Sequence, residues 1–193
     1  MEMPGERQKH AWRTEILARR TALPPDEHAA EARALAAAVA GLDLHGWVCA
    51  YVPVRGEPGS LELLDAMRTA GARVLLPVTG PPGPLDWAEY LGRESLRRAQ
   101  YGLLEPTGAA LTSAAVGWAE LILVPALAVD RRGVRLGRGA GYYDRTLAAA
   151  RADARLVAVV RGDQLVARQP EAPPPSRVGW GQTPRGGVQR LCA

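Results

Sequence analysis

Apolar positions along the chain follow two periods, one typical of helices and one typical of buried strands. Near the N-terminus they recur every three or four residues, as in the stripe formed by Ala32, Leu35, Ala36 and Val39. Later they form short continuous runs, which are typical of strands buried on both faces of a sheet. The expected helices cover residues 5–20, 26–40, 60–71 and 143–150, and the expected strands cover residues 47–52, 74–76, 85–90, 103–106, 121–124 and 156–160.

Turn and cap residues mark where the expected helices begin and end. Prolines at 24–25 end the first helix, while Asp26 and Ser60 are placed to cap the next two helices with their side-chain oxygens. The first helix is expected to bury one face, made of Ala11, Trp12 and Ile16. These signals agree with the apolar periods and support the assigned order of elements.

The order of the elements predicts the fold class. A helix between the strands at 47–52 and 74–76 makes a β-α-β unit, which implies parallel strands joined by a right-handed crossover. The 193 residues suit one domain, and neither a repeat nor an interdomain linker interrupts them. We therefore expect a single three-layer α/β/α domain over residues 1–193 with a mainly parallel sheet.

Composition excludes several classes of protein. The chain is 47% hydrophobic and 23% charged, which is ordinary for a globular protein and unlike a disordered one. No apolar run approaches the ~18 to 20 residues of a membrane helix, and residues 1–15 lack the apolar centre of a signal peptide. Cys49 and Cys192 lie far apart in the sequence, so we expect no disulfide framework and a reducing, cytoplasmic location.

The charge of the chain favours an anionic small molecule over nucleic acid as a ligand. The net charge is +4, and among 24 basic residues Lys9 is the one lysine. The arginines are scattered, and no basic helix or array of alternating aromatic and basic residues is present. We therefore expect neither a nucleic-acid nor a membrane partner.

A glycine-rich loop carries the strongest chemical signal. After the apolar run that ends at Pro125, the chain reaches a loop in which Gly137, Gly139 and Gly141 alternate with Arg138 and Ala140. Glycines let backbone N–H groups converge on one point, and guanidinium groups add positive charge, so a strand, this loop and a helix start together favour a phosphate site. The glycine spacing matches neither of the two common nucleotide fingerprints, and a tight basic turn without a ligand is the alternative.

The residues after the loop strengthen the binding interpretation. Tyr142, Tyr143 and Asp144 supply two aromatic rings for stacking and a carboxylate that can hold a cation beside an anion. The segment that contains Val124-Pro125, Asp130, Gly133 and the run from Arg135 to Arg145 resembles the 5-formyltetrahydrofolate cyclo-ligase family, also called methenyltetrahydrofolate synthetase. This resemblance extends over essentially the whole chain.

The resemblance implies a fold and an activity. The fold is an α/β/α domain with a mainly parallel sheet, of the type called NagB/RpiA/CoA-transferase-like. The activity is the ATP-dependent conversion of 5-formyltetrahydrofolate to 5,10-methenyltetrahydrofolate with release of ADP and phosphate. The implied small-molecule substrates are a reduced folate and ATP, and the implied cofactor is Mg²⁺.

The resemblance also implies roles for individual residues. Lys9 and Arg138 are the implied catalytic residues, and Asp144 is the implied metal ligand. The implied ATP-binding residues are Lys9, Arg13, Arg135, Leu136, Gly137, Arg138, Gly139, Ala140, Gly141, Tyr142 and Tyr143. The implied folate-binding residues are Val52, Glu57, Arg138, Gly139, Ala140, Gly141 and Tyr142.

Each role has a simpler structural alternative. The spacing of Lys9 and Arg13 places both cations on one helix face, which is also typical of a solvated basic face. An Asp just inside a helix start, such as Asp144, is often a capping group. Trp87 fits either a pocket wall or the core, and Glu105-Pro106 suits a structural turn.

One position departs from the family pattern. The family usually has a His-Asp pair near the C-terminus, whose Asp is a second magnesium ligand, where this chain has Pro174 and Pro175. Neither proline can bind a metal or exchange a proton. A catalytically impaired folate- or nucleotide-binding paralogue is therefore the alternative function, and an enzyme acting on another formyl or amide substrate is a third.

Overall fold

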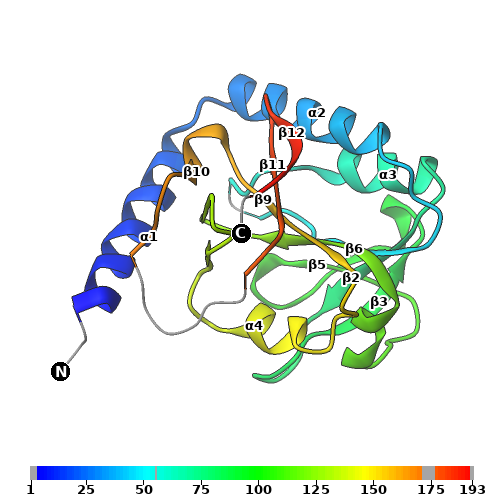
Figure 1. Ribbon diagram of the computed structural model, residues 1–193. Helices are drawn as coiled ribbons and strands as arrows, with labels where there is room; N and C mark the ends of the chain where they lie inside the picture. Colours follow the sequence, from blue (N-terminus) through cyan, green and yellow to red (C-terminus); the bar gives the residue numbers. More distant parts are fainter. Residues whose placement is uncertain (1–3, 55, 171–176, 192–193) are drawn as a thin grey trace.

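The computed structural model describes residues 4–54, 56–170 and 177–191 (Figure 1). The α-helices are α1 (Pro4–Ala22), α2 (Pro25–Ala40), α3 (Leu61–Thr69) and α4 (Tyr142–Leu147). The strands are β1 (Trp47–Cys49), β2 (Arg73–Val78), β3 (Asp86–Tyr90), β4 (Leu96–Arg98), β5 (Leu104–Pro106), β6 (Ala119–Pro125), β7 (Ala128–Asp130), β8 (Arg135–Leu136), β9 (Arg155–Val159), β10 (Leu165–Val166), β11 (Trp180–Thr183) and β12 (Gly187–Arg190). The 3-10 helices are η1 (Arg93–Ser95), η2 (Gln100–Gly102), η3 (Ser113–Trp118) and η4 (Gly162–Gln164).

A seven-stranded sheet forms the centre of the fold, with the strand order β12-β11-β9-β6-β1-β2-β3. The five inner strands run parallel, while β12 and β3 pair antiparallel at the two edges. The parallel pairing of β1 with β2, which α3 connects, confirms the expected β-α-β unit. The fold is therefore mixed α/β with a large, mainly parallel sheet, as the sequence predicts.

Both faces of the sheet are buried, which explains the continuous apolar runs of the inner strands. Alternate residues of β6 point to opposite faces, so that Leu121 and Leu123 join one core cluster and Ile122 and Val124 join another. Residues of α2 and α3 complete the first cluster, and residues of η3 and α4 complete the second. The helices on the second face, η3 and α4, are shorter than α2 and α3 on the first face.

The start of α2 differs in detail from the expectation. The predicted stripe of Ala32, Leu35, Ala36 and Val39 is buried. The helix begins at Pro25, one residue before Asp26, so Asp26 lies inside the helix and does not cap it. The N-cap position is Pro24, which makes no side-chain cap bond. Proline at the first helical position has a φ suited to a helix and loses no needed donor, so the helix begins without a capping side chain.

The strand β1 is shorter than expected, because the chain leaves the sheet early. The Ala50 N–H still donates to the Leu75 carbonyl at 2.9 Å, but no strand pairing continues to Val52. Pro53 and Pro58 follow, and neither has an N–H to donate to a ladder. The released segment forms a loop at the carboxyl edge of the sheet.

The helix α1 packs against a small second sheet, of order β10-β7-β8, beside the main sheet (Figure 1). Its Ile16 forms an apolar cluster with Leu127, Ala128 and Leu136, against which Trp12 is partly buried. Ala11 is exposed, so its predicted place on the buried face is wrong, because the contact with the β7–β8 hairpin is narrow.

No helix in the described ranges is long and apolar enough to cross a membrane.

The β7–β8 hairpin is built around the carboxylate of Asp130, whose side chain is fully buried. This carboxylate accepts hydrogen bonds from the N–H groups of Arg132 (2.9 Å), Val134 (3.0 Å) and Gln169 (3.1 Å). Gly133 in the turn has φ +79°, and a Cβ there would lie 2.1 Å from the carbonyl oxygen of Val178. The turn therefore needs both the carboxylate and the glycine.

We expect Asp130→Asn to destabilise the fold by about 1.5 to 3 kcal/mol at neutral pH, because it removes a charged acceptor of buried hydrogen bonds. Burial raises the pKa of Asp130, but hydrogen bonds from Arg132, Gln169 and Val134 outweigh burial and leave the pKa lowered. The stabilisation is therefore complete above the unfolded-state pKa of about 3.9 and disappears as pH falls through the folded-state pKa.

Urea unfolding of wild type and Asp130→Asn across the acid range measures this difference. The gap between the two free energies of unfolding should shrink below about pH 4. Asp43→Asn, at an exposed position, is the matched control and should change little at any pH. A gap that stays constant down to pH 3 would show that the charge of Asp130 contributes no stability.

Candidate functional site

The glycine loop, residues 137–141, lies between β8 and α4 rather than directly after β6. The sequence predicts that β6 leads into the loop, but the β7–β8 hairpin is inserted between them. The hairpin turns the chain back, so that the loop returns to the carboxyl end of β6. The loop after β1 lies at the same edge, because β1 and β6 are parallel neighbours in the sheet.

The glycines of the loop have structural reasons to be glycine. Gly139 and Gly141 have φ values of +103° and +74°, a region that strains residues with a Cβ. At Gly137, a Cβ would lie 2.7 Å from Nη1 of Arg135. The loop is also attached to α1, since Nε of Arg13 donates to the Gly137 carbonyl at 3.0 Å. Arg13 therefore contacts the loop that the sequence assigns to the same site.

Arg135 is a buried connector below the loop. Its guanidinium donates to the Pro125 carbonyl at 3.1 Å and to Oδ1 of Asp144 at 2.9 Å. It also lies 5.9 Å from the ring centroid of Tyr143, within range of a cation–π contact. These contacts join the end of β6 to α4, and they leave the Asp144 side chain 52% exposed beside the loop.

The two predicted folate-site elements meet at Glu57 and Arg138, 81 residues apart in the sequence. Nε and Nη2 of Arg138 lie 3.2 and 3.1 Å from Oε1 of Glu57. The other carboxylate oxygen accepts the N–H of Val54 at 3.1 Å, which fixes the side chain within its own loop. Glu57 is 10% exposed and Arg138 is 43% exposed, so the carboxylate is held in place while the guanidinium can leave it.

Arg20 is a residue of this region that the sequence analysis missed. It is 3% exposed, and it donates to the Ala126 carbonyl at 2.6 Å and to Oε1 of Gln164 at 2.7 Å. Burial lowers the pKa of Arg20, while the nearby Tyr51 and Glu57 act in the opposite direction. Because a guanidinium keeps its proton in proteins, Arg20 stays charged and offsets the negative charge of the nearby Glu57.

The inward face of α1 could have revealed Arg20. Lys9, Arg13, Ile16 and Arg20 recur at helical spacing, and the structure turns this face toward the hairpin and the glycine loop. The Lys9 side chain is only 12% exposed, and its ammonium lies 3.8 Å from Glu6. A freely solvated basic face would leave Lys9 far more exposed. The structure therefore disfavours the solvated alternative for Lys9 and Arg13.

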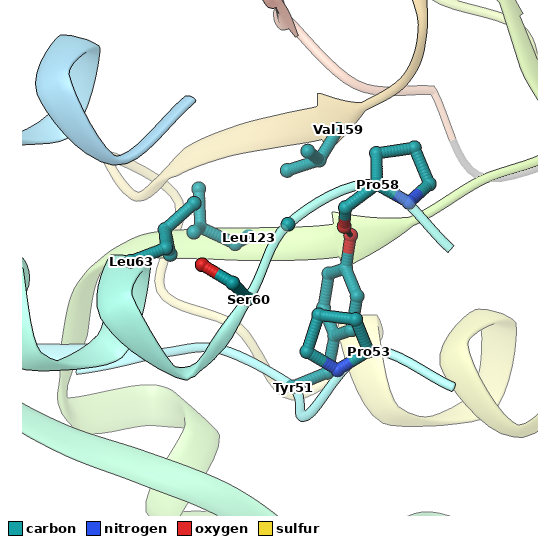
Figure 2. A pocket seen from close by; sticks show the side chains of 8 residues that line it. Tyr51, Pro53, Pro58, Ser60, Leu63, Leu123 and Val159 are labelled. Carbon is teal, nitrogen blue, oxygen red and sulfur yellow. Dashed lines mark hydrogen bonds between the residues drawn. The ribbon is translucent and has the colours of Figure 1, made fainter. Parts of the chain in front are cut away.

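The loop after β1 closes over a small apolar cavity (Figure 2). The Tyr51 hydroxyl points toward Pro58 and donates to its carbonyl at 3.3 Å (Figure 2). Burial and the negative charge of Glu57 raise the pKa of Tyr51. The cavity has a volume of about 10 Å³, room for about one water molecule, so it is too small to hold an organic ligand.

The remaining aromatic and apolar candidates divide between site and core. Tyr143 packs against the second core cluster, and burial raises its pKa. Tyr142 is less covered and lies 5.8 Å from the guanidinium of Arg145. Val52 is half-buried against the first core cluster, next to the loop that holds Glu57. Trp87 is fully buried, so it belongs to the core and not to a pocket wall.

A magnesium ion would find one predicted carboxylate here. Asp144 is exposed and lies beside the glycine loop, which suits an ion that is held mainly by phosphate oxygens and water. Within residues 4–54, 56–170 and 177–191, no group of three or more His, Cys, Asp or Glu side chains is placed to hold a metal. Pro174 and Pro175 lie outside the described residues.

The site brings together cations of α1, a glycine loop beside Asp144, and a fixed carboxylate on the neighbouring loop. A model of the 5-formyltetrahydrofolate cyclo-ligase family matches residues 5–176. The chain belongs to this family. Membership confirms the resemblance predicted from the sequence and makes the chain a relative of ligases of folate metabolism.

Individual relatives agree with this membership. The chain is 47% identical over 191 residues to the 5-formyltetrahydrofolate cyclo-ligase of Mycolicibacterium smegmatis, which covers 96% of this chain and 98% of the relative. The structure of this chain resembles that of the 5,10-methenyltetrahydrofolate synthetase of Aquifex aeolicus, with a TM-score of 0.76 and 25% sequence identity. The match covers 96% of this chain and 93% of that one. The synthetase of Mycoplasma pneumoniae shares the fold, with TM-score 0.67, 16% identity, and coverage of 86% and 92%.

We expect the contact between Glu57 and Arg138 to contribute little to stability, because the exposed guanidinium is screened by water. A double-mutant cycle with Glu57→Gln and Arg138→Met should give a coupling of about 0.2 to 1 kcal/mol in the free energy of unfolding. Urea unfolding of the four proteins measures it. A coupling above about 2 kcal/mol would identify the contact as structural, with Arg138 unavailable to a ligand.

Proposed function

We propose that this family member converts 5-formyltetrahydrofolate to 5,10-methenyltetrahydrofolate at the expense of ATP, releasing ADP and phosphate. The observation that supports this most directly is the convergence on one loop of two separate groups. Arg13 of α1 contacts the loop through Gly137, and Glu57 contacts it through Arg138. One side of the loop therefore carries cations suited to a triphosphate, and the other side carries a carboxylate suited to a pterin.

On the phosphate side, the loop and α1 provide complementary positive charge. Backbone N–H groups near residues of positive φ, such as Gly139 and Gly141, can form a concave anion site. Arg13 supplies a guanidinium already positioned by its bond to the loop, and Lys9 supplies a compact ammonium one helical turn away. The proposed ATP contacts therefore come from a small region.

On the folate side, Glu57 is positioned to accept hydrogen bonds. A pterin presents ring N–H and amino donors, which a carboxylate accepts strongly. Glu57 is held by Val54 and now occupied by Arg138, so a pterin would take the place of the guanidinium. The ring of Tyr142 and the side chain of Val52 are the apolar surfaces proposed to contact the pterin.

The released Arg138 completes the proposed mechanism. The formyl oxygen attacks the γ-phosphorus of ATP, the bond to the β-phosphate oxygen breaks, and ADP leaves with that electron pair. The second folate nitrogen then attacks the activated formyl carbon, the bond from that carbon to the phosphate oxygen breaks, and the proton of that nitrogen leaves with the phosphate. Arg138 and Lys9 stabilise the charge that develops on the transferred phosphoryl group. Glu57 keeps the formyl group facing that phosphoryl group by fixing the ring.

Asp144 is the proposed protein ligand for magnesium. When bound, the ion offsets the charge of the triphosphate. Arg135 holds one carboxylate oxygen of Asp144, and the exposure of the side chain leaves it accessible from the loop. We still expect a reducing, cytoplasmic location, and the free thiol of buried Cys49 is compatible with that expectation.

An absorbance assay for methenyltetrahydrofolate with purified protein, ATP and magnesium tests the proposed function. Product should form in equal amount to released ADP. Binding of both ligands without product would instead support the impaired paralogue, whose motivation is Pro174-Pro175. Product from another formyl or amide substrate, with none from 5-formyltetrahydrofolate, would support the third function.

Lys9→Met should lower kcat or ATP affinity by roughly ten- to more than a hundredfold, because it removes one charge-assisted contact to phosphate. Steady-state kinetics with varied ATP measure this effect. Arg7→Met is the matched control, since Arg7 is exposed on the same helix. Equal kinetics in wild type and Lys9→Met would remove Lys9 from the phosphate site.

Asp144→Asn should be nearly inactive, and nucleotide-dependent magnesium binding should be lost with it. Wild type without nucleotide should bind magnesium very weakly, because one carboxylate and water hold this ion poorly. Calorimetric titration of magnesium with and without a non-hydrolysable ATP analogue measures binding independently of turnover. Asp153→Asn, at an exposed aspartate after α4, should behave as wild type. Unchanged magnesium binding in Asp144→Asn would place the metal elsewhere.

A further inference from the structure

A second hollow lies next to the candidate site, between the loop after β2 and the β4–β5 hairpin. It is an open cleft of about 580 Å³, far larger than the cavity under the loop after β1. Thr79, Arg97, Arg98, Gln100 and Glu105 line it. Its lining is thus mainly polar and basic, which suits an anionic ligand.

The two arginines of this cleft, Arg97 and Arg98, pair with no acidic side chain in the part of the chain that the structure describes. Neither Arg97 nor Arg98 forms an ion pair within 4.0 Å with an acidic side chain in the described stretches, whereas Arg135 and Arg138 are both paired. Glu105 stands opposite Arg97 in the hairpin, but it is buried and its carboxylate accepts the N–H of Thr79. The cleft therefore keeps a net positive charge that faces solvent.

One loop connects the cleft with both parts of the candidate site. The loop after β2 starts beside the loop after β1, because the strands are parallel with Cys49 opposite Leu75. At its other end, the Leu85 N–H donates to Oγ1 of Thr146 on α4 at 2.8 Å. Since α4 begins at Tyr142, the cleft and the candidate folate surface lie along the same edge of the sheet.

We propose that this cleft binds the acidic tail of the folate, through Arg97 and Arg98. The proposal rests on the proposed function, because it takes the pterin to lie at Glu57. A folate ends in a glutamate with two carboxylates, the anions that a guanidinium fork binds best. Its methyleneamino, benzoyl and amide linker spans about 10 Å on standard bond lengths.

The spacing of the elements fits that reach. The strand β2 is the neighbour of β1, and β5 packs beside β2, where Glu105 bonds Thr79. Hydrogen-bonded strands lie about 4.8 Å apart and packed sheets about 10 Å apart, so the step from β1 to β2 and on to the separate β4–β5 sheet amounts to about 10 to 15 Å. A pterin at Glu57 can therefore place its glutamate over Arg97 and Arg98.

The test compares two substrates in the full-length protein. One is 5-formyltetrahydrofolate, and the other is an analogue whose glutamate is replaced by an uncharged amide. In the double variant Arg97→Ala/Arg98→Ala, KM for the natural substrate should rise about ten- to a hundredfold, with kcat and KM for ATP unchanged. KM for the uncharged analogue should be high in wild type and should not change in the variant.

Arg33→Ala/Arg190→Ala is the matched control, since it removes two exposed arginines on α2 and β12 and should leave both KM values at the wild-type level. Equal KM values for the natural substrate in wild type and the cleft variant would overturn the proposal. A rise in KM for ATP would overturn it too and assign the cleft to the triphosphate. If the double variant does not fold, Arg97→Gln and Arg98→Gln, tested singly, should each raise KM for the natural substrate only.

Direct binding separates this proposal from the proposed function. If wild type forms no product, the proposed function fails, and tryptophan fluorescence then measures the dissociation constants of both folates in the same proteins. Tighter binding of the glutamate-containing folate, lost in the cleft variant, would still support the tail site. Equal binding of the two folates, or no binding of either, would overturn it.

Discussion

The buried carboxylate of Asp130 is the interaction on which the site most depends. It satisfies N–H groups of the turn between β7 and β8 and of Gln169, which follows β10. That turn sets the direction in which β8 leaves, and β8 carries Arg135 and leads into the glycine loop. The apolar cluster of the same hairpin holds α1 and its basic face. The hydrogen bonds to Asp130 offset the cost of burying its charge. This one carboxylate therefore orients the glycine loop and α1, two of the three groups that form the candidate site.

The charges around the glycine loop form alternating, mutually neutralising contacts. Arg20 lies near Glu57, Glu57 accepts a hydrogen bond from Arg138, and Asp144 accepts one from Arg135. The members nearer the core are fixed by backbone carbonyls, Arg20 by that of Ala126 and Arg135 by that of Pro125. The outer members, Arg138 and Asp144, are more exposed. Substrates can therefore replace outer contacts without leaving a buried charge unpaired, which would cost several kcal/mol.

Local patterns predicted the sheet and the motif well, because both depend on residues close in sequence. The apolar runs identified every inner strand of the parallel sheet except β11, and the glycine loop identified the edge at which the chemistry is proposed. Long-range packing was not predictable in this way. Arg20 looked like one arginine of a charged helix, although 144 residues separate it from its partner Gln164. Asp130 was recognised as part of a motif, but its buried hydrogen bonds depend on a segment of the chain far from its own turn. The roles that the family resemblance implies for individual site residues stay predictions.

The attachment of α1 has a thermodynamic consequence. This helix carries Lys9 and Arg13, and it packs on a two-strand hairpin through a small apolar cluster rather than on the main sheet (Figure 1). Small interfaces of this kind open locally at a lower free-energy cost than a core does. Any anion that contacts α1 and the glycine loop together favours the docked helix, so its binding energy also becomes local stability of α1. Binding of such an anion and order of α1 are thus one coupled equilibrium.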